Sequence, residues 1–81
     1  MNLTVLTPEK ELFAGDITSV KVPGIKGQFE ILKGHAAIVS ALSNGIVRII
    51  DKSGNKTEIS IAKGFIEVLR NEVSVLVTLP K

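Results

Sequence analysis

The segment VPGIKGQFEILKGHAAIVS, residues 22–40, contains one of the three prolines and three of the seven glycines of the chain. Pro23 and Gly24 open it, and further glycines follow at Gly27 and Gly34. Proline fixes the backbone φ and removes a hydrogen-bond donor, whereas glycine allows a positive φ and close backbone approach. The pattern therefore predicts a strand, a sharp loop, a short strand, a second sharp corner and then an apolar exit.

The two corners of this segment place particular side chains at exposed positions. Ile25 and Lys26 occupy the first tip, and the second corner contains Lys33, Gly34 and His35. A tip bounded by glycines needs no core contact from its own side chains, so these are free to face a partner. An apolar residue beside a basic one at such a tip predicts a surface that contacts another molecule.

The remaining segments alternate with a period of two residues, which is typical of half-buried strands. In residues 17–22, the side chains of Thr18, Val20 and Val22 share one predicted face. The same alternation occurs in two later segments, residues 56–61 and 73–79. No window shows a sustained helical period of 3.6 residues.

We therefore predict an all-β fold in a single domain over residues 1–81. About eight to ten short, mostly antiparallel strands are expected to form a flattened β-sandwich or barrel. Large apolar residues on the buried faces are the predicted core, among them Phe29, Ile59, Phe65 and Val75.

The composition limits the classes of partner and chemistry. The 81 residues carry a formal net charge of +2, include no cysteine and are 44% hydrophobic. Such a charge is well short of a polyphosphate-binding surface, and a chain without cysteine has no disulfide framework or thiolate metal site. Residues 1–7 lack the basic and apolar regions typical of a signal peptide, and the apolar runs are too short to span a bilayer. We expect a cytoplasmic protein without direct membrane insertion.

The residue types needed for catalysis are sparse, and we expect no catalytic, cofactor-binding or metal site and no cofactor. His35 is the only histidine, and no phosphate-loop motif G-x-x-x-x-G-K-[ST] occurs. Nucleic-acid binding by a small β domain needs exposed aromatic residues on which bases stack. The only aromatic residues are three phenylalanines among apolar neighbours, so we expect no nucleic-acid partner. Because the phosphate-loop motif is missing, we also expect no tight nucleotide binding.

One alternative function stays open at Lys52, which lies with Asp51 and Ser53 at a predicted hairpin tip. Lipoyl and biotinyl carrier domains are all-β domains of about this length that present a modified lysine at such a place. Against this alternative, residues 52–55 are also typical of an ordinary hairpin. The residues before Asp51 are Arg-Ile-Ile, which lack the usual flanks of a carrier lysine.

Five segments of the chain resemble the epsilon subunit of the rotary ATP synthase, which is called delta in mitochondria. They are LTVLTPEKELFAG at 3–15, VPGIKGQFEILKGHAAIV at 22–39, NGIVRI at 44–49, KGFIEV at 63–68 and NEVSVL at 71–76. The chain departs from this family at Glu30, where glycine is common, and at Lys33 and Ala37, where proline is frequent. Typical relatives continue into a C-terminal pair of helices, which we expect this chain to lack.

The resemblance implies a non-catalytic subunit at the foot of the central stalk. One surface of such a sandwich grips the gamma subunit, and another rests on the polar loops of the membrane rotor ring. The flow of protons or sodium ions turns the ring, and the sandwich helps the stalk to turn with it. The implied location is peripheral, on the cytoplasmic side of an energy-transducing membrane, as in a bacterial cell.

The resemblance also implies interface residues by their position in the matched segments. The residues expected to face the rotor ring are those of the first tip and its exit, Ile25, Lys26 and Gln28. The residues expected to lie on the gamma side are Thr7, His35 and Ser40.

Overall fold

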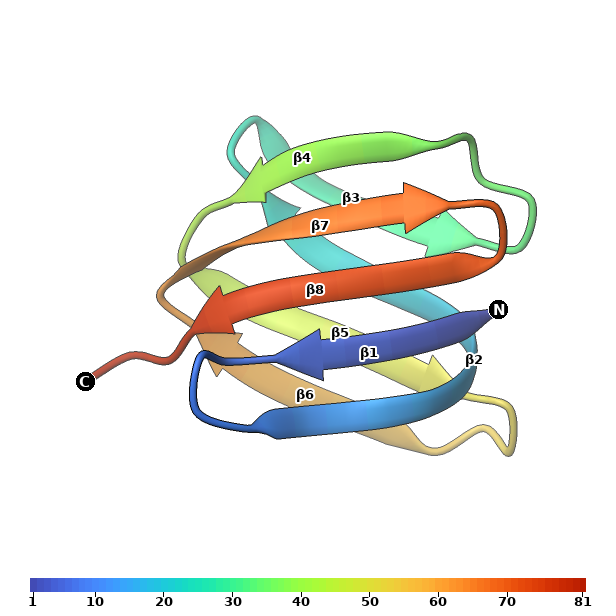
Figure 1. Cartoon of the computed structure of the whole chain (residues 1–81), viewed down its shortest axis with the longest axis horizontal. Helices are drawn as coiled ribbons and strands as arrows, with labels where there is room; N and C mark the ends of the chain where they lie inside the picture. The colour runs from blue at the N-terminus through green and yellow to red at the C-terminus, as the bar shows by residue number, and fades with distance from the viewer.

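The computed structural model of the protein describes all residues from Met1 to Lys81, and it contains eight β-strands and no helix (Figure 1). In chain order the strands are β1 (Asn2–Leu6), β2 (Glu11–Gly24), β3 (Gly27–Leu32), β4 (Ile38–Leu42), β5 (Gly45–Asp51), β6 (Lys56–Ile61), β7 (Lys63–Leu69) and β8 (Glu72–Thr78). This inventory confirms the all-β prediction. The structure has no helix with the length and apolar character needed to cross a membrane.

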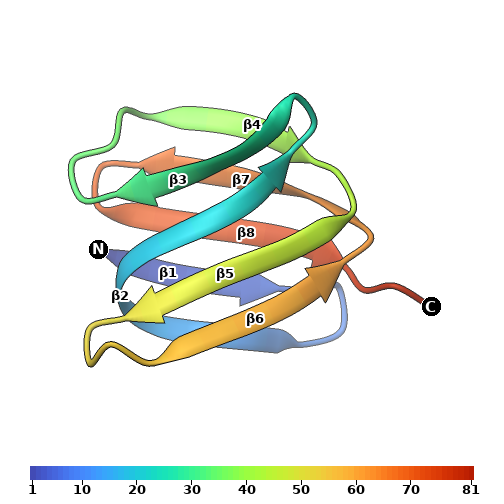
Figure 2. The same ribbon diagram turned by 180° about the vertical axis from the view of Figure 1, so that it is seen from behind.

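The strands pack as two layers, which Figures 1 and 2 show from opposite sides. The layer at the front of Figure 1 contains β4, β7, β8 and β1, and the layer behind it contains β3, β5 and β6. β2 belongs to both, because residues 11–16 pair with β1 and residues 17–24 pair with β5 and β3. All strand pairs are antiparallel except β1 with β8. The result is the predicted sandwich.

The second strand differs from the prediction in length and in its faces. β2 has 14 residues, whereas the alternation indicated a strand only over residues 17–22. Its pairing with β5 shifts register between Ile17 and Ser19, so Thr18 is the extra residue of a β-bulge. The side chain of Thr18 is exposed. The prediction that Thr18 shares the buried face of Val20 is therefore wrong.

The two layers enclose a core of 15 apolar residues, most of them β-branched. Such side chains suit the pleated surface of a strand, and burying each contributes about 1.5–3 kcal/mol. Val75 is completely buried, as predicted, while Phe29 and Ile59 are partly buried and pack against the core. The core residues are Leu3, Val5, Ile17, Val20, Val22, Ile31, Leu42, Val47, Ile49, Ile61, Ile66, Val68, Val73, Val75 and Val77.

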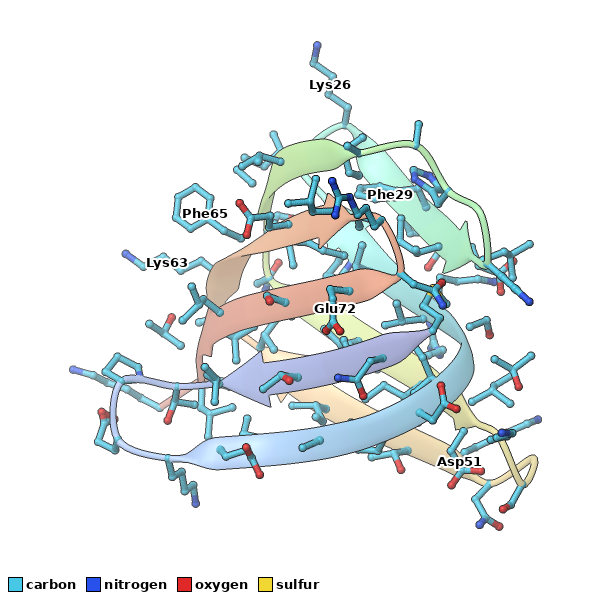
Figure 3. The ribbon with its side chains drawn as sticks, turned by 45° about the vertical axis from the view of Figure 1, so that its right-hand side comes forward. Lys26, Phe29, Asp51, Lys63, Phe65 and Glu72 are labelled. Atoms are coloured by element: carbon cyan, nitrogen blue, oxygen red, sulfur yellow. The ribbon has the colours of Figure 1, made fainter.

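Phe65 is not a core residue, and this part of the core prediction is wrong. On β7 the residues Gly64, Ile66 and Val68 point inward and are buried. Successive side chains of a strand point to opposite faces, so Phe65 must point outward. Its side chain is 59% exposed and projects away from the sandwich in Figure 3. The alternation of the strand decides the face that Phe65 occupies, despite the size of its ring.

Candidate functional site

The turn between β2 and β3 forms the tip that the sequence predicts. Gly24 and Gly27 pair with each other and leave Ile25 and Lys26 as the two turn residues. Gly27 has a φ of 124°, a region that favours glycine. A Cβ atom at Gly24 would lie 2.7 Å from the ring of Phe29, which is too close. Backbone requirements therefore shape the tip without a core contact from Ile25 or Lys26.

The side chains at the tip face outward. Ile25 is 66% exposed, and Lys26 projects from the top of the molecule in Figure 3. Together with Gln28 at the start of β3, they border a shallow depression of about 670 Å³. Ser40 of β4 lies at the same depression. The structure thus brings the three predicted ring-facing residues together and places one residue of the gamma set beside them.

Thr7 serves the turn between β1 and β2. Its Oγ1 accepts hydrogen bonds from the backbone amides of Glu9 at 3.2 Å and Lys10 at 3.0 Å. The same hydroxyl donates to the carbonyl oxygen of Lys10 at 3.2 Å. Thr7 is only 9% exposed. The hydroxyl of Thr7 is therefore already hydrogen-bonded within the turn. A partner at this position would contact the turn that Thr7 stabilises.

His35 lies in the connection between β3 and β4. Its backbone amide donates to the carbonyl oxygen of Leu32 at 3.0 Å, which closes a turn in which Gly34 has a φ of 83°. Its Nδ1 lies 2.8 Å from the carbonyl oxygen of Ala36, and a protonated Nδ1 can donate to it. This hydrogen bond orients the ring and leaves Nε2 as the nitrogen that can meet a partner.

The three predicted gamma-side residues do not form a cluster. The turn that holds Thr7 and the connection that holds His35 lie at opposite ends of the front layer in Figure 1. Ser40 lies within β4, opposite Ile66 of β7. The outer face of β1, β8, β7 and β4 separates these positions. Because Ile66 points inward, the side chain of Ser40 turns away from the outer face and lies at the β4 edge beside the tip.

That outer face carries apolar residues that sequence reasoning missed. Phe65 of β7, Leu76 of β8 and Val39 of β4 are all exposed large hydrophobic residues. Phe65 and Leu76 also line an open groove of about 440 Å³, which Ile25 borders as well. The sequence feature that could have revealed the exposure of Phe65 is the alternation of residues 63–69. Gly64 points inward in this strand, so its neighbour Phe65 points outward.

The charged groups form three ion pairs, and none of them is enclosed. The carboxylate of Asp16 lies 3.0 Å from the Met1 amine and 3.6 Å from Nζ of Lys52. The hydrogen bond and the positive charge of the Met1 amine, followed by the charge of Lys52, lower the pKa of Asp16 below 3.8. Arg48 pairs with Glu58 at 2.9 Å on the outer face of the back layer. No group of three His, Asp or Glu side chains lies close enough to hold a metal ion.

The chain matches a family model and curated proteins along most of its length. Residues 1–78 match the model described as ATP synthase, Delta/Epsilon chain, beta-sandwich domain. The chain is 42% identical over 74 residues to the ATP synthase epsilon chain of Chlorobaculum tepidum, covering 91% of this chain and 84% of the relative. The ATP synthase epsilon chains of Campylobacter hominis and Protochlamydia amoebophila are 41% and 42% identical, again over 91% of this chain. This chain spans only 58% and 50% of those two relatives.

Solved structures share the fold. A chain of the Euglena gracilis mitochondrial ATP synthase, in a structure of OSCP, F1 and c-ring, has a TM-score of 0.86 at 22% identity, over 93% of this chain and 48% of that one. A chain from the central stalk and c-ring of the Tetrahymena thermophila mitochondrial ATP synthase has a TM-score of 0.80 at 17% identity, over 95% and 62%. These identities support the fold alone, whereas the family model covers nearly the whole sequence. The chain therefore belongs to the ATP synthase delta/epsilon-chain family, whose β-sandwich domain it forms.

Proposed function

We propose that the chain is a non-catalytic subunit of the central stalk of a proton- or sodium-translocating ATP synthase. In this role it binds the gamma subunit and the membrane rotor ring, and so helps to couple ion flow to ATP synthesis. The observation that carries the proposal is the family match over residues 1–78. The named assemblies of the two solved neighbours, a central stalk with a c-ring and F1 with a c-ring, agree with this role.

We assign the tip residues Ile25 and Lys26, with Gln28, to the rotor ring. Ile25 offers apolar area that is not needed by the core, because it is 66% exposed. Lys26 offers a charge that can pair with acidic or carbonyl-rich loops. In protein interfaces, buried apolar anchors supply more of the binding energy, while charges at the rim tune association. Ile25 is therefore the anchor of the proposed ring contact.

We assign the outer face of the front layer to the gamma subunit, with Thr7 and His35 at its two ends and Ser40 at its β4 edge. The Thr7 hydroxyl is already bonded within its turn, and Ser40 Oγ lies 3.4 Å from the carbonyl oxygen of Ala41. These two side chains have few polar groups left for a partner. The proposed gamma contact therefore depends on the shape of the layer and on Nε2 of His35.

The proposed mechanism is mechanical, and no bond is made or broken. The tip and the front layer belong to one sandwich joined by 50 backbone–backbone hydrogen bonds. Strand β4 connects the two surfaces directly, because Ala41 accepts a bond from the Ile25 amide at 3.4 Å and pairs with Phe65. A rigid body of this kind can pass rotation from the ring to gamma, from a peripheral position on the cytoplasmic side of the membrane.

The proposal is tested by pull-down with the tagged 81-residue chain from detergent-solubilised membranes of the source cell. Recovery of the gamma subunit and the ring subunit is the expected result. A Lys52→Gln variant should recover both equally, because Lys52 lies outside both proposed surfaces. Recovery of neither subunit would contradict the proposal. Intact mass distinguishes the carrier alternative, since a chain modified at Lys52 gains the mass of its cofactor and Lys52→Gln does not.

A further inference from the structure

Four apolar side chains form a row across the outer face of the front layer. Leu6 of β1 pairs with Leu76 of β8, Leu76 pairs with Phe65 of β7, and Phe65 pairs with Ala41 of β4. Residues paired in register point to the same face of a sheet, so these side chains lie side by side. Phe65 and Leu76, at the centre of this apolar row, are 59% and 52% exposed.

The residues that flank the apolar row carry opposite charges on its two sides. Two positions before and after Phe65 on β7 are Lys63 and Glu67, both exposed. Figure 3 shows Lys63 and Phe65 projecting from the same side of the molecule. Beside the two charged residues lie Thr78 and Ser74 of β8. Neither Lys63 nor Glu67 takes part in any of the three ion pairs of the chain.

This pattern is complementary to itself. Consider two copies that face each other, related by a two-fold axis that runs along the apolar row. Each residue of the row then lies opposite the same residue of the other copy. The same axis also places Lys63 of each copy over Glu67 of the other, and Ser74 over Thr78. A two-fold axis along the strands would instead place Lys63 on Lys63 and Glu67 on Glu67. The charges therefore select the first arrangement, in which β7 of one copy runs antiparallel to β7 of the other.

We propose that two copies of this chain associate through the outer face of β1, β8, β7 and β4. Phe65 and Leu76 lie at the centre of the interface, and two Lys63–Glu67 ion pairs lie at its margins. Facing sheets pack about 10 Å apart, a spacing that large apolar side chains from both sheets fill. The apolar row supplies the attraction, and the charges set the orientation. This association goes beyond the proposed function, because it concerns the chain without gamma or the ring.

The first test is sedimentation velocity of the 81-residue chain from micromolar to millimolar concentration. The average mass is expected to rise with concentration from 8.7 kDa toward twice that value. The Phe65→Asp variant is expected to stay monomeric while it keeps the far-UV circular dichroism spectrum of the parent. A parent chain that remains monomeric at millimolar concentration would overturn the proposal, as would a folded Phe65→Asp variant that associates like the parent.

The second test exchanges the charges. Each of the variants Lys63→Glu and Glu67→Lys replaces two attractive contacts by two repulsive ones, so each should weaken association about tenfold. The double variant restores both contacts and should associate like the parent. Lys56→Glu, on the back layer, changes the net charge as Lys63→Glu does and should have no effect. Failure of the double variant to recover, or loss of association with Lys56→Glu, would overturn the proposed interface.

Discussion

Phe65 and Ile66 are neighbours on β7 whose side chains lie on opposite faces of the sheet. Ile66 is completely buried, so Ile66→Ala should lower the free energy of unfolding by about 2–5 kcal/mol. Phe65→Ala should lower it by less than about 1 kcal/mol, because the ring already faces solvent. Urea denaturation of both variants measures the two values. Equal losses would mean that Phe65 contributes to the core despite its exposure.

Asp16 makes the stability of the chain sensitive to acid. Its pKa is lowered in the folded state by the Met1 amine and Lys52, so the charged form favours folding. This contribution is present above the ordinary value of 3.8 and is lost as pH falls through the lowered pKa. Asp16→Asn should therefore melt at a lower temperature than the parent at neutral pH, and the difference should shrink as the medium is acidified below 3.8.

Glu9 provides the control for this pH dependence. It is exposed on the turn after β1 and forms no ion pair, so Glu9→Gln should melt like the parent at each pH. Thermal melts followed by circular dichroism give the comparison. If the difference in melting temperature between Asp16→Asn and the parent stays constant through acidification, the carboxylate charge is not the cause of that difference.

At the level of strands, the tip between β2 and β3 could be predicted from the sequence, whereas the course of β2 could not. Pro23, Gly24 and Gly27 specify a turn through their own backbone preferences, which act locally. The bulge at Thr18 depends on pairing with β5, about thirty residues later in the chain, and leaves no local signal. The outward position of Phe65 was encoded locally in the alternation of β7, but the size of the ring favoured a core assignment.

At Gly64 the backbone of β7 lies close against β8. A Cβ atom there would collide with the carbonyl oxygen of Leu76 and lie 2.9 Å from Cγ1 of Val77. Backbone atoms cannot move aside as a flexible side chain can, so Gly64→Ala should destabilise the chain by about 1–3 kcal/mol. Gly15→Ala is the matched control. Its added Cβ atom would have no neighbour closer than 3.8 Å, and the change in unfolding free energy should stay within about 0.5 kcal/mol.

Chemical denaturation of the two alanine variants distinguishes these sites. A clear loss of stability in Gly64→Ala with little change in Gly15→Ala is the expected result. Equal stability of the two variants would show that β7 and β8 can separate without loss, which would contradict the close approach seen in the sandwich.

In the whole molecule, the proposed gamma contact and the proposed self-association surface lie on the same front layer. The apolar row runs from Leu6, next to Thr7, to Ala41, next to Ser40, and Thr7 and Ser40 belong to the proposed gamma contact. A copy of the chain and a gamma subunit would therefore exclude each other from this layer. Ile25 borders the same groove as Phe65 and Leu76, so a partner on the apolar row would also cover part of the Ile25 side chain. Self-association would thus hide the apolar row before assembly, and binding of gamma would replace it.

Docking of the tip to the rotor ring should be separable from folding. Ile25→Asp replaces an exposed apolar anchor by a charge and should weaken docking by about 1–3 kcal/mol. Lys26→Ala removes a charge at the rim and should weaken docking by about 0–1 kcal/mol. Neither side chain belongs to the core, so the melting temperature should change by only a few degrees. The two variants therefore differ in docking while they match in stability.

The measurement is ATP-driven ion pumping by a reconstituted enzyme that carries each variant, with ATP hydrolysis recorded alongside. With Ile25→Asp, hydrolysis should continue while pumping falls, because the ring no longer follows the stalk. Lys26→Ala should pump nearly as well as the parent. Normal pumping by an Ile25→Asp enzyme that retains the subunit would rule out the tip as the ring contact. A collapsed melting temperature together with lost pumping would instead assign the Ile25 side chain to the stability of the fold.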